Sequence, residues 1–404
     1  MHKRSTMLFL TASLLINPLI SSAADSAANY WLSVATDSGG MASAMGKQAA
    51  AESVGGGFLG GLFGSITGKA GNMVSGPNRS LLLQLNSPQS LPTDPRTVHD
   101  IPKGMSMGDS LPLLIPEPGK TSPVTEERTP YEKGEKPKGR MLIYWGCGDK
   151  VGAGQPKIID FAKMVATSLP SRHGSTVYPP SPSRGKIYAD WPNRENSKSI
   201  PSDASLVGDH FVHGNFTPDI HFSLDKQQDF MAPVELGNKG STLNWKTIPT
   251  AIGYFIMASG SSGNGDMIVW TSSREADMGW GMMDYVPTPD VRKFVKSKVV
   301  LPADATECAI PAEVAGKSQG MMAQMIAYGE DLNTAWPVKP QKPQAYVKVR
   351  LKSTGSLMLG NQTQGTAAAG GSDGGRSYSS APREKSSTEK AVDGVQSIRS
   401  LFGF

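Results

Sequence analysis

One aspartate and three histidines lie close together in the chain and are the side chains best suited to chemistry. They are Asp209, His210, His213 and His221. A carboxylate with several imidazoles could bind a transition metal and support a metal-dependent hydrolase. The spacing lacks a helical i, i+4 pair, and in an extended segment His210 and His213 point to opposite faces. The pattern therefore favours ordinary surface or hydrogen-bonded histidines, and we predict no cofactor.

Other enzyme signals are weak. The pattern GxSxG occurs around Ser106, Ser318 and Ser372. A nucleophile elbow needs a buried strand before the serine and a helix after it, and none of the three serines has that context. The sequence contains neither HExxH nor a P-loop motif. We therefore predict that the protein is not an enzyme.

Three aromatic residues form a second group of candidates. Trp280 and Tyr285 belong to the methionine-rich segment 277–285, and Trp270 precedes it. If these rings are exposed, they form an adaptable surface, and a carbohydrate-binding module would use them to stack on sugars. If the segment instead folds over a core, the rings are buried. The sequence leaves both interpretations open.

The two cysteines, Cys147 and Cys308, are about 160 residues apart. An even count in an exported protein favours a disulfide, with buried or reactive thiols as alternatives. No CxxC motif points to a zinc or redox centre. A disulfide here would join two domains or two distant strands.

Residues 1–24 predict a cleavable signal peptide. His2, Lys3 and Arg4 form a basic start, residues 7–20 are apolar, and small residues precede Asp25. The apolar run is shorter than the roughly 20 residues of a spanning helix. We therefore expect export to the periplasm or cell envelope, or secretion. The net charge of +5 comes from mixed signs without a basic stripe, which argues against nucleic-acid binding.

The chain contains 45 glycines, concentrated in two segments, 39–76 and 355–375. Helical spacing of Tyr30, Trp31 and Val34 predicts a helix at the start of residues 25–78. A segment with glycine at every fourth position from Gly56 to Gly68 follows, either as a glycine-zipper-like helix or as a flexible linker. Residues 354–386 predict a disordered Gly/Ser-rich linker, and residues 387–404 predict an amphipathic helix.

The fold class predicted for the rest is mainly β, with one or two β-sandwiches. Residues 79–224 predict a Pro-rich β domain with long loops. Residues 225–353 contain short apolar runs separated by turn residues, which is typical of a sandwich.

One part of this second domain resembles a known family. The pattern Leu243-x-Trp245-x-x-x-Pro249-x-Ala251-x-x-Tyr254-x-Ile256 resembles the B-to-C strand signature of fibronectin type III-like (immunoglobulin-like) sandwiches. Residues 230–233 are similar to a first strand and residues 321–337 to a last strand pair. The resemblance implies that Trp245, Tyr254 and Ile256 are core residues. It covers only residues 226–338, and the segment 272–298 is longer than an ordinary sandwich loop.

These observations predict an exported binding or structural protein of the cell envelope with an unknown ligand. Its apolar segments 55–68 and 391–404 would contact a protein partner, the membrane surface or each other. The alternatives are the carbohydrate-binding module and the metal-dependent hydrolase centred on His210 and His213.

Overall fold

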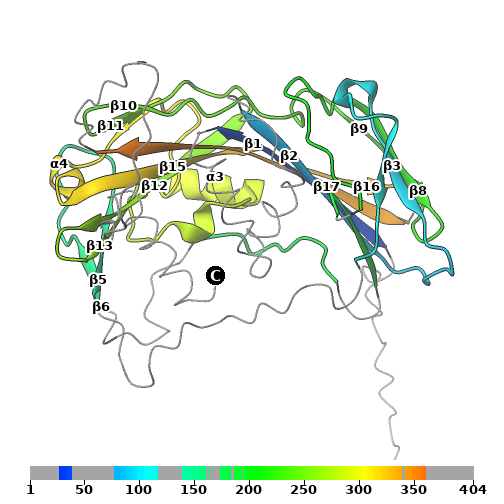
Figure 1. The fold of residues 1–404 in the computed structure, drawn as a ribbon, viewed down its shortest axis with the longest axis horizontal. Helices are drawn as coiled ribbons and strands as arrows, with labels where there is room; N and C mark the ends of the chain where they lie inside the picture. The colour runs from blue at the N-terminus through cyan, green and yellow to red at the C-terminus, as the bar shows by residue number, and fades with distance from the viewer. Residues whose placement is uncertain are drawn as a thin grey trace, which may run out of the picture.

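The computed structural model describes residues 27–38, 77–116, 139–160, 163, 173–182, 186–193, 195–338 and 342–360. It is mainly β with several sheets, as the sequence predicts. The described strands form sheets of ten, four and three strands. Figure 1 shows long strands crossing most of the molecule, with the smaller sheets near their ends.

The ten-stranded sheet, called here the large sheet, is mixed. Most neighbouring strands are antiparallel, whereas β1 with β17 and β5 with β13 are parallel. Its strands in spatial order are β6 (Lys157–Asp160), β5 (Arg140–Trp145), β13 (Met267–Thr271), β12 (Ala251–Ser262), β15 (Ser318–Gly329), β17 (Ala345–Leu359), β1 (Ala28–Ser38), β2 (Asn78–Ser87) and β7 (Ile187–Trp191), and β16 (Leu332–Trp336) also pairs with β17.

Strand β1 shows that the predicted N-terminal helix is wrong over Ala28–Ser38. The strand lies between β17 and β2 and pairs with both. Its side chains are buried on both faces, Leu32 and Val34 on one face and Ser33 and Ala35 on the other. A continuous apolar run fits a central strand as well as a helix, so the spacing alone could not separate the two. The long-range pairing with β17 decides between them.

Two smaller sheets pack on one face of the large sheet and share its main core. The four-stranded sheet contains β4 (Ser110–Leu113), β3 (Thr97–Asp100), β8 (Gly208–Gly214) and β9 (Ile220–Leu224). The three-stranded sheet contains β10 (Gly237–Lys239), β11 (Thr242–Asn244) and β14 (Glu307–Ala309). In Figure 1 they lie toward opposite ends of the large sheet.

The other face of the large sheet is covered by helix and loop. Helix α3 (Thr288–Lys296) follows Pro287 and buries Val291. Phe255 and Met257 of β12 pack in the same cluster as Val291, while Tyr254 and Ile256 point to the main core, as strand alternation requires. The short helices η2 (Lys103–Met105), η5 (Trp280–Met282) and α4 (Ala312–Ala315) complete the described elements.

Strands from both sides of the expected domain boundary at 224/225 belong to the large sheet. That boundary therefore does not separate two sheets. Strand β17 continues to Leu359, beyond the expected start of the linker at residue 354. The signal peptide, residues 39–76 and residues 361–404 lie outside the described residues.

Candidate functional site

The histidines that the sequence singled out do not meet at one point. His210 on β8 points inward and is 1% exposed, whereas His213 points outward and lies 3.1 Å from Asp100 Oδ2 through Nε2. His221 stacks on Phe211 on the outer face, with ring centroids 4.0 Å apart. The part of the chain that the structure describes contains no group of three or more His, Cys, Asp or Glu placed to hold a metal ion. These contacts do not support a hydrolase centred on His210 and His213.

A chain of hydrogen bonds that the sequence did not reveal links the large sheet to the four-stranded sheet. The Tyr30 hydroxyl on β1 lies 2.7 Å from His99 Nδ1 on β3. His99 Nε2 lies 2.9 Å from His210 Nδ1, and His210 Nε2 lies 2.7 Å from the Leu206 carbonyl oxygen. We call Tyr30, His99, His210 and the Leu206 carbonyl the histidine chain. The alternation of side chains along β3 and β8 is a sequence signal that could predict that both imidazoles point inward. It does not predict that they lie next to each other.

The aromatic candidates do not form an exposed platform. Trp270 is fully buried and its Nε1 donates a hydrogen bond to the Gly146 carbonyl oxygen at 3.1 Å. Tyr285 is buried and Trp280 is half-buried. The segment 277–285 therefore folds over a core, which is the second of the two interpretations of this sequence. A ring that is buried on both faces cannot stack on a sugar.

Beneath this segment lies a row of basic side chains from β17. Every second residue from Lys348 to Lys352 is basic, with Arg350 between them. The centroid of the Tyr285 ring lies 4.3 Å from Arg350 Cζ and 4.4 Å from Lys352 Nζ. Lys352 Nζ donates to Asp284 Oδ1 at 3.0 Å, and Lys348 Nζ lies 2.9 Å from Asp331 Oδ2. Burial lowers the pKa of Arg350 and raises the pKa of Asp331. This pairing of buried charges anchors the segment and fits a structural role.

A second anchor holds the loop at residues 173–182. His173 Nδ1 lies 2.7 Å from the Oδ2 atom of Asp277, whose side chain is buried. The other Asp277 oxygen accepts the Gly279 amide at 2.7 Å. The His173 ring packs edge-on against Phe294 of α3 at 5.1 Å between centroids. No local sequence pattern indicates this pair, because the two residues are 104 positions apart.

The cysteines and the expected sandwich-core residues lie where the smaller and larger sheets meet. Cys147 and Cys308 form a disulfide between the loop after β5 and strand β14. Trp245 follows β11 and packs edge-on against Tyr254 of β12, with centroids 5.7 Å apart. Trp245, Tyr254 and Ile256 are all buried in the main core.

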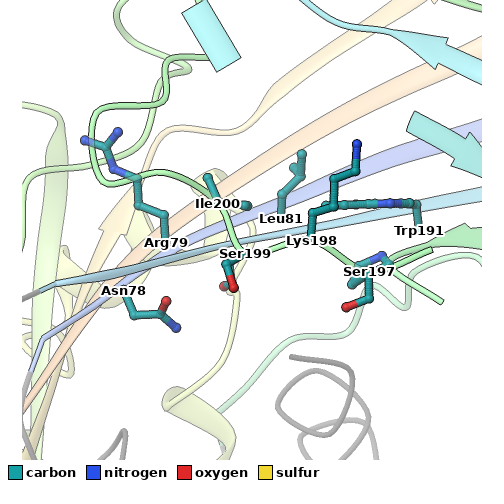
Figure 2. A pocket seen from close by; sticks show the side chains of 10 residues that line it. Asn78, Arg79, Leu81, Trp191, Ser197, Lys198, Ser199 and Ile200 are labelled. Atoms are coloured by element: carbon teal, nitrogen blue, oxygen red, sulfur yellow. The ribbon is translucent and has the colours of Figure 1, made fainter. Parts of the chain in front are cut away.

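A small hollow lies beside the ends of β2 and β7 (Figure 2). Its lining includes Asn78, Arg79 and Lys198, and Figure 2 shows the two cationic side chains directed away from Asn78. Arg79 donates to the Ala204 carbonyl oxygen, and Lys198 Nζ donates to the Met107 carbonyl oxygen at 3.3 Å. Both cations thus bind backbone carbonyls, and the hollow does not gather them around a ligand.

Comparison of the chain with protein-family models, curated proteins and solved structures finds no match. Within the described ranges, no helix is long and apolar enough to cross a membrane. The geometry of this chain is therefore the basis for any functional proposal.

The described strands show where the two glycine-rich segments are attached. Asp37, near the end of β1, pairs with Asn78 at the start of β2, so residues 39–76 connect two adjacent antiparallel strands. Ser38 pairs with Gly355 of β17, which runs parallel to β1. The chain beyond Leu359 therefore continues from the same end of the sheet. Neighbouring strands in a sheet are about 4.8 Å apart. Strand β17 extends four residues, or about 13 Å, beyond Gly355, the residue that pairs with Ser38 at the end of β1.

Proposed function

We propose that this protein is an exported structural or binding protein of the cell envelope. Its β body would present segments 55–68 and 391–404 together to a protein partner or the membrane surface. The observation that carries this proposal is the attachment of both glycine-rich segments to the same end of three adjacent strands, at Ser38, Asn78 and Leu359. Segments attached at one end of a rigid sheet have a high effective concentration for a shared partner.

Export is supported by two features that fit together. The basic and apolar pattern of residues 1–24 is typical of a signal peptide. The Cys147–Cys308 disulfide suits an oxidising compartment such as the periplasm.

For the fold, we propose that residues 225–353 form a sandwich similar to fibronectin type III. Strand β17 completes this sandwich and continues to Leu359. Immunoglobulin-type sandwiches place strands A, B and E in one sheet and C, F and G in the other. The order β10-β11-β14 matches A-B-E, and β13-β12-β15-β17 matches C′-C-F-G. In this assignment β10 takes the place of residues 230–233, which form no strand, and the last strand pair is β15 with β17 instead of residues 321–337. The parallel additions β5 and β1 extend both edges of the second sheet, a departure from an isolated sandwich that also protects those edges. An experimental structure in which these two sheets do not face each other would contradict this assignment.

The functional proposal is tested by removing the two segments without disturbing the body. Because Asp37 pairs with Asn78, residues 39–76 can be replaced by Asn-Gly to make a two-residue hairpin between Ser38 and position 77. Pro77→Thr is added, because proline lacks the N–H that closes this turn. A second variant ends at Gly360. The matched control replaces residues 39–76 with a polar Gly/Ser segment of equal length. Each variant is expressed with its leader, and its partition between envelope and soluble fractions is measured.

We expect the doubly shortened protein to move to the soluble fraction as a monomer while its thermal unfolding midpoint stays within a few degrees of the full chain. The polar control should match the Asn-Gly variant, because apolarity rather than length provides the contact. Unchanged envelope association in the doubly shortened, folded protein would overturn the proposal.

A further inference from the structure

The histidine chain spans the contact between the large sheet and the four-stranded sheet. Tyr30 belongs to β1 of the large sheet, while His99 and His210 belong to β3 and β8 of the four-stranded sheet. Among the described residues, the backbone hydrogen bonds that join these two sheets are the reciprocal pair between Leu114 and Asp190. The contact otherwise depends on side chains, so the histidine chain is one of its main directional links.

The hydrogen-bond partners fix the direction of the histidine chain. The Leu206 carbonyl oxygen can only accept, so His210 Nε2 must carry a proton. A neutral His210 then accepts at Nδ1 from the Nε2–H of His99. His99 Nδ1 in turn accepts from the Tyr30 hydroxyl. Every nitrogen is satisfied when both imidazoles are neutral.

Adding a proton disrupts this arrangement. A proton on His210 Nδ1 would require His99 to reverse, with Nε2 accepting and Nδ1 donating to the Tyr30 oxygen. The Tyr30 hydroxyl proton would then lose its acceptor, since the described hydrogen bonds give this hydroxyl no other partner. A second proton would place two donors opposite each other between His99 and His210. Neutral imidazoles are therefore a condition of the intact chain.

The surroundings offer little to stabilise a positive charge. His99 is fully buried, and Phe222 of β9 stacks on His210 with the ring planes 5° apart. The titratable groups acting on the two imidazoles are Tyr30 from β1, the imidazoles themselves from β3 and β8, and Asp209 from β8. Burial lowers the pKa of both histidines, strongly for His99. The hydrogen bond to the Leu206 carbonyl oxygen and, to a smaller extent, Asp209 raise the pKa of His210, but burial has the larger effect and the pKa is lowered.

We propose that the histidine chain is a pH-sensitive contact that holds the four-stranded sheet on the large sheet at neutral pH and releases it in mild acid. The released state exposes the imidazoles, which then bind protons near their ordinary pKa of about 6.5. Below that pH, protonation of one histidine raises the equilibrium constant for release by up to about tenfold per pH unit. Protonation of both raises it by up to about a hundredfold per pH unit. Release would uncover the apolar inner face of the sheet, which includes Leu111, Val212 and Phe222.

The test uses the full chain with its disulfide intact. Amide hydrogen exchange is measured at pH 7.5 and pH 5.0, corrected for the intrinsic effect of pH, on β3, β8 and β9 and on β12 and β15 as an internal reference. We expect the four-stranded sheet to lose at least tenfold more protection than the reference strands. Equal loss in both regions would overturn the proposal.

Variants identify the group responsible. In His210→Gln, the amide can donate from Nε2 to Leu206 and accept at Oε1 from His99, but it does not titrate. This variant should show about a tenfold smaller loss of protection per pH unit. The outer-face variant His213→Gln is the matched control and should behave as wild type, because His213 pairs with Asp100 within the four-stranded sheet.

If His210→Gln does not fold, NMR titration of the wild-type imidazoles gives the second test. His99 and His210 should remain neutral down to the pH at which the sheet is released. Protonation of either imidazole near pH 6.5 with the sheet still protected would refute the proposal.

Discussion

Cys147 and Cys308 are bonded across the contact between the large sheet and the three-stranded sheet, with Cα atoms 5.1 Å apart and a sequence separation of 161. Cys147 follows β5, and Cys308 lies within β14 next to Leu243 of β11. The bond therefore joins a strand from the first half of the chain to the small sheet formed by the second half.

Loss of this disulfide should destabilise the protein substantially. A loop of this length corresponds to about 5 kcal/mol in the loop-entropy model. We expect the Cys147→Ser, Cys308→Ser double variant to have a free energy of unfolding about 3–5 kcal/mol lower, measured in urea. Thiol titration of the wild-type protein under denaturing, non-reducing conditions should find no free thiol, and two free thiols would contradict the assignment.

Breaking the ion pair between Lys352 and Asp284 should destabilise the protein far more than breaking a surface pair. The Lys352 side chain is 3% exposed, so Asp284→Ala would leave a buried ammonium group without its carboxylate. Loss of one partner of a buried pair costs about 3–5 kcal/mol. The control is Glu235→Ala, which removes the exposed partner of Lys246 and should cost under about 1 kcal/mol. Similar urea midpoints for the two variants would show that Lys352 finds another partner or water.

Local patterns predicted a good part of this structure. Apolar and β-branched runs indicated strands, and the motif around Trp245 and Tyr254 correctly placed both residues in a core. Period-two alternation also anticipated that His210 and His213 face opposite sides of one strand. These features depend on neighbours within a few positions, so the sequence carries them directly.

Pairing between distant segments could not be predicted in this way. Strand β1 pairs with β17, which lies more than 300 residues later in the chain. A short apolar run does not show which distant segment it will pair with. The same limit applies to the histidine chain, in which His99 and His210 are 111 positions apart. The segment 277–285 is buried because the basic row of β17 and Asp284 hold it, an interaction equally invisible to local periodicity.

The Tyr30 hydroxyl should stabilise the folded state at neutral pH. In Tyr30→Phe, the buried His99 Nδ1 loses its donor. An unsatisfied buried acceptor costs about 1–3 kcal/mol, which urea unfolding at pH 8 would detect. Tyr346→Phe, at a position that is 41% exposed, is the matched control and should change the free energy of unfolding by less than about 0.5 kcal/mol. Equal effects of the two substitutions would argue against the hydrogen bond.

Asp190 should give a pH dependence opposite in sign to that of the buried histidines. Burial raises the pKa of this half-buried carboxyl to about 6, although the Tyr188 hydroxyl donates to it at 3.0 Å. The folded state then binds a proton more tightly than the unfolded state, whose carboxyl has a pKa near 4. The resulting stabilisation is complete below about pH 4 and is lost as the pH rises through about 6. Asp190→Asn removes the ionisable group and keeps an oxygen that can accept from Tyr188.

We expect Asp190→Asn to be about 1–2 kcal/mol more stable than wild type at pH 8, where the wild-type carboxylate is charged and partly desolvated. The difference should shrink as the pH falls through 6 and vanish near pH 4. Urea unfolding of both proteins from pH 4 to 8 measures it, and comparison at each pH cancels the opposing contribution of His99 and His210. A difference that stays constant across this range would mean that the substitution acts through packing and that the Asp190 carboxyl is not the titrating group.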